Sequence, residues 1–192
     1  MIRVAVVGDI GSGKSFVAKL FGYPVFNADN EVGYLYQKNK KCYNALKKKL
    51  PKFIFSFPVK KKEISNAIIG DKNNLKKIIK IIHPMISSSM NKFIKKHKRK
   101  KILILDIPLL MENKINKQND VIIFIDAKKQ EINKRIKKRN NYNEKVMRKF
   151  KKLQLPVELK KKKSNFIIKN NFKVNDVKKN VRNIVKKILL YA

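Results

Sequence analysis

Short apolar runs recur along the chain, and each has the length of a β-strand. Several of them, such as VAVV, ILIL and VIIFI, are continuous rather than alternating. Continuous runs are typical of strands in a parallel sheet that is covered on both faces. The runs predict five strands, at Ile2–Val7, Tyr23–Phe26, Ile102–Ile107, Val121–Ile125 and Phe166–Ile168.

The segments between these runs repeat their apolar residues at helical spacing. They predict helices at Lys14–Phe21, Glu31–Leu50, Lys61–Ile69, Asn74–Ile82, Ser87–His97, Lys128–Lys138 and Val174–Leu190. We expect a break at His83-Pro84, because proline disfavours a helix interior. Alternating strands and helices indicate an α/β domain with right-handed crossovers. The almost entirely helical interval from Asn30 to Lys101 predicts a lobe inserted between the second and third strands.

Length and composition favour one globular domain of 192 residues, which is enough for a sizeable core. No apolar stretch reaches 18 residues, so we expect no transmembrane helix. The apolar N-terminus leads directly into a glycine loop, which indicates a buried strand rather than a signal peptide. Cys42 is the single cysteine, which excludes an intramolecular disulfide and fits a reducing, cytoplasmic setting.

The formal net charge is +36, from 49 basic and 13 acidic side chains. A basic surface attracts polyanions without sequence preference. The lysines, however, are spread over the whole chain together with asparagine and isoleucine, which indicates a compositional bias rather than a basic groove. We therefore expect salt-sensitive, non-specific attraction to anionic surfaces but no specific nucleic-acid partner.

The segment Gly8-Asp9-Ile10-Gly11-Ser12-Gly13-Lys14-Ser15 matches the phosphate-binding P-loop pattern. Glycines allow the backbone to aim its N–H groups at phosphate, and the lysine and serine of the motif serve the phosphates and Mg²⁺. An apolar strand precedes the loop and a helix follows it, as the motif requires. Asp9 is unusual, because a carboxylate inside the cradle would repel phosphate. We expect its side chain to point away.

Two acidic residues follow predicted strands at the edge where ligands of open α/β sheets bind. Asp29 could accept a proton from an acceptor hydroxyl or order Mg²⁺ and its waters, or it could cap the next helix. Asp106 ends a buried strand and could reach Mg²⁺ through water, or it could bond to loop amides.

Arg135 and Arg139 lie four residues apart on one predicted helix face. In small kinases such arginines neutralise the transferring phosphoryl group, whereas the plain alternative is a solvated basic face. Arginine is scarce in this lysine-rich chain, which favours a functional role for the pair.

Taken in order, several motifs resemble the dephospho-CoA kinase family over nearly the whole chain: GDIGSGKS, NAD, HPMI, DIPLLMEN, VIIFIDAKKQEINKRIKKR, KKLQLP and SNFIIKNN. The resemblance implies a three-layer P-loop fold with a parallel sheet of about five strands and helices on both faces. It implies core segments at 2–29, 101–127 and 164–192, an acceptor lobe at about 30–100 and a lid at about 128–160. It also implies transfer of the ATP γ-phosphoryl group, with Mg²⁺, to the ribose 3′-hydroxyl of dephospho-CoA by a cytoplasmic, monomeric enzyme.

The resemblance also assigns residues to roles. Lys14, Asp29 and Arg139 would be catalytic, with Asp29 as the base. ATP would contact Asp9, Ile10, Gly11, Ser12, Gly13, Lys14, Ser15, Phe16, Arg135 and Asn170, and Ser15 would hold Mg²⁺. Dephospho-CoA would contact Asp29, Lys61, His83, Leu109, Leu110 and Glu112.

Four positions depart from the family pattern, namely Asp9, Phe16, Asn27 and Lys61. The alternatives that remain are another small-molecule P-loop kinase acting on a nucleoside or its monophosphate, a basic nucleic-acid-binding module, and a kinase that has lost its activity. An acceptor panel separates the first from the family's reaction, and clustered aromatic and basic residues would favour the second.

Overall fold

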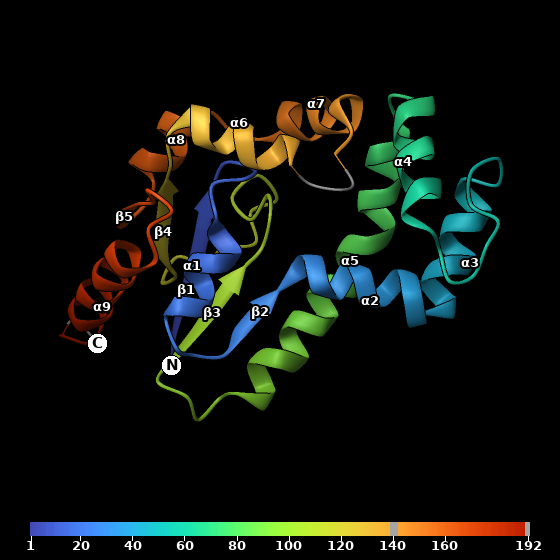
Figure 1. Ribbon diagram of the computed structural model, residues 1–192. Helices are drawn as coiled ribbons and strands as arrows, with labels where there is room; N and C mark the ends of the chain where they lie inside the picture. Colours follow the sequence, from blue (N-terminus) through green and yellow to red (C-terminus); the bar gives the residue numbers. More distant parts are fainter. Residues whose placement is uncertain (139–141, 191–192) are drawn as a thin grey trace. The chain divides into compact units, whose positions relative to one another are not determined.

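The computed structural model describes residues 1–138 and 142–190, which form two compact units. The sheet unit comprises Met1–Asn27, His97–Tyr142 and Leu153–Ala192, and the helical unit comprises Ala28–Lys96 and Asn143–Lys152 (Figure 1). The helical unit is thus assembled from two separate stretches of the chain.

The sheet unit is built on five parallel strands in the order β2-β3-β1-β4-β5. Their bounds are β1 Ile2–Gly8, β2 Val25–Asn27, β3 Ile102–Asp106, β4 Val121–Asp126 and β5 Phe166–Lys169. All five strands predicted from the sequence are confirmed to within a few residues. In the central strand, Val4 is in register with Ile104 of β3 and with Val121 of β4. The carboxyl end of β1 therefore lies between two neighbours, where ligands of such sheets bind.

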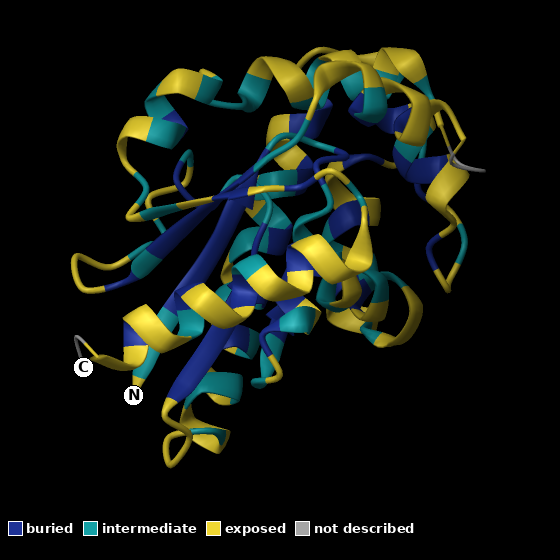
Figure 2. Ribbon diagram, turned by 60° about the vertical axis from the view of Figure 1, so that its left-hand side comes forward, coloured by how far each residue is buried: buried dark blue, intermediate teal, exposed yellow. Residues whose placement is uncertain are grey.

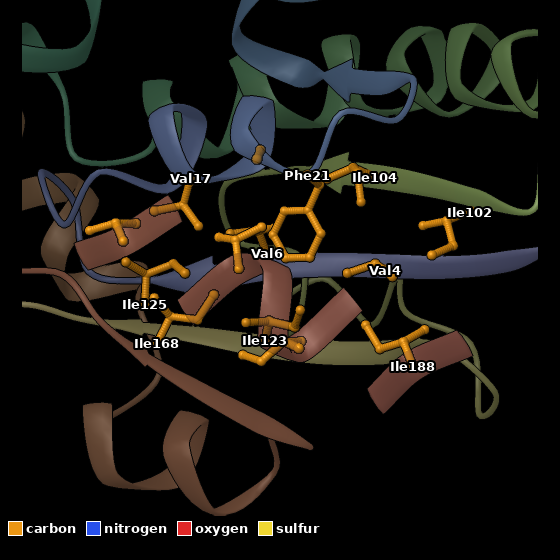
Figure 3. Close-up of a cluster of buried hydrophobic side chains, with 14 residues drawn as sticks. Val4, Val6, Val17, Phe21, Ile102, Ile104, Ile123, Ile125, Ile168 and Ile188 are labelled. Atoms are coloured by element: carbon orange, nitrogen blue, oxygen red, sulfur yellow. The ribbon is translucent and has the colours of Figure 1, made fainter. Parts of the chain in front are cut away.

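Helices cover both faces of this sheet. Helices α1 (Lys14–Leu20) and α9 (Val174–Leu190) pack on one face, where a cluster of hydrophobic side chains is almost completely buried (Figure 3). On the opposite face, α8 (Val157–Lys162) brings the Lys161 ammonium to 5.7 Å from the centre of the Phe124 ring. Both faces of the inner strands are therefore buried (Figure 2), which explains their continuous apolar runs.

The helical unit contains α2 (Ala28–Lys38), α3 (Lys40–Lys49), α4 (Lys61–Gly70), α5 (Asn74–Lys96) and most of α7 (Glu144–Leu153). The predicted single helix Glu31–Leu50 is wrong, because it divides at Asn39 into α2 and α3. Asn39 has extended backbone angles (φ −103°, ψ 98°), and its side chain accepts a hydrogen bond of 2.8 Å from the Cys42 N–H. Asparagine competes well for such a cap, so it ends the helical run despite uninterrupted apolar spacing.

The predicted break at His83-Pro84 is also wrong, because α5 continues through Pro84 as one helix of 23 residues. Proline removes one backbone hydrogen bond and crowds the preceding turn. Burial of one continuous apolar stripe on either side of it offsets this loss, since each fully buried aliphatic side chain contributes about 1.5–3 kcal/mol. The stripe consists of Leu75, Ile78, Ile82, Ile86 and Met90.

Two helices of the described chain, α7 and α8, lie between Lys138 and β5, where the sequence predicted no helix. In the helical unit, the Lys149 ammonium of α7 donates to the carbonyl oxygens of Ile68 and Ile69, at the end of α4, and of Asp71 just beyond it. A cation at a helix C-terminus compensates carbonyls that have no partner within the helix. Lys149 therefore fastens α7 to α4.

Among residues 1–138 and 142–190, no helix has the length and apolar character needed to cross a membrane.

Candidate active site

The loop between β1 and α1 has the backbone of a phosphate cradle. Gly11 and Gly13 have φ angles of +88° and +90°, which side-chain-bearing residues rarely adopt. A Cβ on Gly13 would overlap the amide nitrogen of Asn170, and one on Gly11 would lie 2.7 Å from Ile136 of α6 (Lys129–Lys137). Both space and conformation therefore require glycine at these two motif positions.

The buried side-chain amide of Asn170 supports the phosphate loop. Asn170, which follows β5, donates from Nδ2 to the carbonyl oxygen of Ser12 (2.8 Å) and accepts at Oδ1 from the Phe172 N–H (2.9 Å). Ser12 and Asn170 are both buried. The Ser12 hydroxyl, although buried, has no hydrogen-bond partner among the residues that the structure describes. The resemblance assigned Asn170 to ATP binding, and its contacts here are with the phosphate loop and the segment after β5.

Lys14 curls back onto its own loop. Its ammonium donates to the carbonyl oxygens of Gly8 (3.2 Å) and Asp9 (2.8 Å). These contacts keep the charge beside the backbone turn that would surround phosphate.

Three side chains meet where β1, β2 and β3 end. The Asn27 amide donates to the Asp106 carboxylate, and its nitrogen also lies 3.5 Å from the Ser15 hydroxyl oxygen. Asp106 is only 1% exposed, so this donor compensates part of its desolvation. An aspartate at position 27 would instead place two carboxylates together. Asn27 thus satisfies a buried acid that the sequence had linked only to Mg²⁺ or loop amides.

Asp9 lies beside a lysine. Its carboxylate is 40% exposed and 4.0 Å from the ammonium of Lys160, a residue of α8. The same ammonium is 3.5 Å from Glu112, whose carboxylate also accepts from the Leu155 N–H (3.0 Å). The unusual acid of the P-loop is therefore paired with a cation.

A small hollow of about 10 Å³ lies at the carboxyl ends of β1 and β3. Gly8 and Lys14 line it on the P-loop side, and Leu109, Glu112 and Lys160 contribute to the remaining walls. Leu109 has a left-handed backbone (φ 58°), which turns the chain across the end of β3. The adjoining Leu110 also lines the hollow but is only 1% exposed, so most of its side chain belongs to the core.

Arg135 and the segment after β5 meet next to the loop. The Arg135 guanidinium carbon lies 4.4 Å from the centre of the Phe172 ring, which is close enough for a cation–π contact. That ring would be 3.4 Å from a Cβ on Gly13. Arg139, predicted as the catalytic lid arginine, lies outside the described residues.

The remaining predicted residues divide between the two units. Phe16 is half-buried and packs against the core cluster of the sheet unit, and Ile10 is half-buried in the loop. Asp29 lies in the first turn of α2, Lys61 is the exposed first residue of α4, and His83 lies within α5. The Nε2 atom of His83 is buried and has no hydrogen-bond partner within the described parts of the chain. These three belong to the helical unit, whereas the loop and the hollow belong to the sheet unit.

Sequence reasoning missed Lys160 and Phe172. Lys160 stands in a run of four lysines, Lys160–Lys163, and nothing in that run distinguishes the buried member from the others. Phe172 follows two asparagines, and its left-handed backbone (φ 63°) could not be inferred from a phenylalanine.

Comparison with known proteins gives a consistent result. The family model described as dephospho-CoA kinase matches residues 2–176. A dephospho-CoA kinase of Wolbachia pipientis is 32% identical over 187 residues, which is 95% of each chain. A crystal structure of TT1252 from Thermus thermophilus aligns with a TM-score of 0.75 at 23% identity, over 97% of each chain. A dephospho-CoA kinase structure from Campylobacter jejuni gives 0.61 at 22% identity, over 97% of this chain and 96% of that one. The two structures support the fold, and the matched family model together with the curated relative establishes that the chain belongs to the dephospho-CoA kinase family.

Proposed function

We propose that this chain transfers the γ-phosphoryl group of ATP to the ribose 3′-hydroxyl of dephospho-CoA, giving coenzyme A and ADP. The observation that carries the proposal is the glycine cradle with Lys14 folded onto it, in a chain that matches this kinase family from residue 2 to residue 176. In phosphoryl transfer the protein acts mainly by positioning and by electrostatic stabilisation, which suits a preformed cradle.

ATP binds along the loop from Asp9 to Phe16. The backbone N–H groups of the glycine turn contact the phosphates, and the Lys14 ammonium exchanges the carbonyls of Gly8 and Asp9 for β- and γ-phosphate oxygens. Asn170 lies beside Gly13, and Arg135 contacts Phe172, which also lies beside Gly13. Both residues therefore border the nucleotide. Ile10 and Phe16 contribute through the backbone, since Phe16 directs its ring to the core.

The residues near Ser15 suit Mg²⁺. Mg²⁺ prefers oxygen ligands and keeps several waters, so a phosphate-bound ion needs few protein groups. The hydroxyl of Ser15 and, through water, the carboxylate of Asp106 provide such oxygens, and Asn27 lies between them. In the described chain, no three His, Cys, Asp or Glu side chains gather into a metal site, which fits an ion that arrives with the nucleotide. When bound, Mg²⁺ neutralises charge on the phosphates.

Asp29 takes the proton of the acceptor hydroxyl, and Arg139 neutralises the transferring group. Asp29 follows β2 by two residues, which suits a base carried from the sheet into the acceptor lobe. On the acceptor side we assign Lys61, His83, Leu109, Leu110 and Glu112. Lys61 offers a single positive charge to a substrate phosphate.

The proposal is tested with purified protein, MgATP and dephospho-CoA, with coenzyme A measured by chromatography and mass spectrometry. The assay is run without nucleic acid, because a chain of net charge +36 binds polyanions. The salt concentration is kept low so that the attraction of the anionic substrates is not screened. We expect coenzyme A to form only with dephospho-CoA and ATP together, and gel filtration to show a monomer. Phosphorylation of a nucleoside or nucleoside monophosphate instead would assign another acceptor, and no product with any acceptor would refute kinase activity. We place the reaction in the cytoplasm, where a lone buried cysteine stays reduced.

A further inference from the structure

Lys160 is buried where a lysine is least expected. The residue is 2% exposed, whereas Lys162 and Lys163 beside it are exposed. Lysine is almost never fully buried unless it is paired, because removing its ammonium from water is unfavourable. Many other lysines of this chain are exposed. The burial of this one at the end of the central strand therefore indicates that its surroundings compensate the charge.

That environment consists of two carboxylates from different parts of the site. The Lys160 ammonium lies 4.0 Å from Asp9 in the P-loop and 3.5 Å from Glu112 beside the hollow. Asp9 is held on two sides, because its carbonyl oxygen accepts from the Lys14 ammonium at 2.8 Å. Glu112 is likewise held on two sides, since it also accepts from the Leu155 N–H. Lys160 thus connects the ATP loop to the wall of the hollow.

We propose that Lys160 is a positioning residue of the kinase: it holds the Asp9 carboxylate away from the phosphate cradle and fixes Glu112 at the hollow. The proposal has two parts, the nucleotide arm, which concerns Asp9, and the acceptor arm, which concerns Glu112. The acceptor arm rests on the proposed function, whereas the nucleotide arm requires only that the chain binds MgATP. It explains how an acid is tolerated in a loop that must hold a polyanion. Without Lys160, the Asp9 side chain can turn toward the phosphates and repel them.

A double-mutant cycle distinguishes this role from a general charge effect. We expect Lys160→Met to weaken MgATP binding roughly tenfold, measured as Kd by isothermal titration calorimetry. In an Asp9→Asn background the same substitution should change Kd by less than roughly threefold, because no carboxylate remains to be held. Lys160→Arg should retain most of the affinity. The matched control is Lys162→Met, which removes one charge from an exposed position of the same helix and should leave Kd unchanged.

The acceptor arm is read from kinetics. Lys160→Met should raise KM for dephospho-CoA several-fold, roughly as much as Glu112→Gln, while the kcat of either variant changes by less than roughly threefold. A merely structural role would lower kcat and the unfolding temperature together.

Equal effects of Lys160→Met with and without the Asp9 charge would overturn the proposal, because Lys160 would then act independently of Asp9. If Lys160→Met does not fold, the same cycle is run with Lys160→Gln, which also removes the charge: a loss of affinity that disappears in the Asp9→Asn background supports the proposal, and an equal loss in both backgrounds overturns it. If the wild type binds MgATP but makes no coenzyme A, the proposed function fails while the nucleotide arm is still tested.

Discussion

Substitution of Gly13 by alanine tests the construction of the phosphate loop. At this position φ is +90°, and a Cβ would overlap the Asn170 amide nitrogen. A non-glycine residue in such a conformation is strained by about 1–3 kcal/mol. Displacing Asn170 removes its buried hydrogen bond to the Ser12 carbonyl (2.8 Å), and a buried polar group left without its partner is destabilised by about 1–3 kcal/mol. The two effects together lower the free energy of unfolding by about 2–6 kcal/mol.

Gly33 is the matched control. It lies inside α2 and does not have a left-handed backbone, and a Cβ at this position would meet nothing within 4 Å. Gly33→Ala should therefore stabilise the helical unit by about 0.5–1 kcal/mol. The same chemical change thus has opposite expected signs at the two glycines.

Urea unfolding followed by circular dichroism measures both variants, and calorimetric titration measures MgATP affinity. Near a chain length of 192 residues, a change of 1 kcal/mol shifts Tm by roughly 2–4 °C, so Gly13→Ala should lower Tm by roughly 4–24 °C. It should also weaken MgATP binding by roughly tenfold or more, because the N–H groups of the cradle move. Wild-type stability and affinity in Gly13→Ala would refute the argument that Asn170 and the backbone turn require glycine here.

Two further predictions concern single side chains. Asp29→Asn should lower kcat by roughly 10²–10⁴-fold with little change in MgATP Kd if Asp29 is the base, and wild-type turnover would exclude that role. Burial raises the pKa of the Cys42 thiol to about 11, so the native protein should resist iodoacetamide at pH 8.5 and react after unfolding in urea. The thiol of the folded state keeps its proton to a higher pH than that of the unfolded state, so the free energy of unfolding should fall as pH rises from about 8.5 toward 11. Cys42→Ala should show a smaller fall. Rapid labelling of the native thiol by iodoacetamide would contradict its burial.

The strands could be predicted from the sequence because burial on both faces imposes continuous apolar runs. The helix boundaries could not, because they depend on local competition. Asn39 ends α2 through one side-chain hydrogen bond, which apolar spacing does not reveal. Pro84 is accommodated within α5 because the packing of a long apolar stripe outweighs one missing backbone bond. In both places the tertiary environment decides between two locally reasonable outcomes.

Site residues could be predicted from the residues alone only where they lie within one contiguous motif. The P-loop identified Lys14 and Ser15 and drew attention to Asp9. It did not reveal that Asn170, which lies 158 residues from Ser12 in sequence, supports the loop through its amide, because that contact depends on the pairing of β4 with β5. Asn27 was recognised only as a departure from the family pattern. Its role became evident when the sheet order placed it beside Asp106.

Because lysine is so frequent in this chain, a functional lysine outside a motif is not recognisable from the residue type alone. Burial in the structure distinguishes it from the solvent-exposed lysines. Outside the P-loop, Lys61 alone among the lysines was assigned a role from the sequence, and the others were treated as solvent-exposed side chains. Desolvation applies a different test, because a buried ammonium persists only where carboxylates compensate it. Lys160 meets that test with Asp9 and Glu112. The unusual acid of the P-loop and the buried lysine are therefore two halves of one feature, and a change at either position should be judged together with the other.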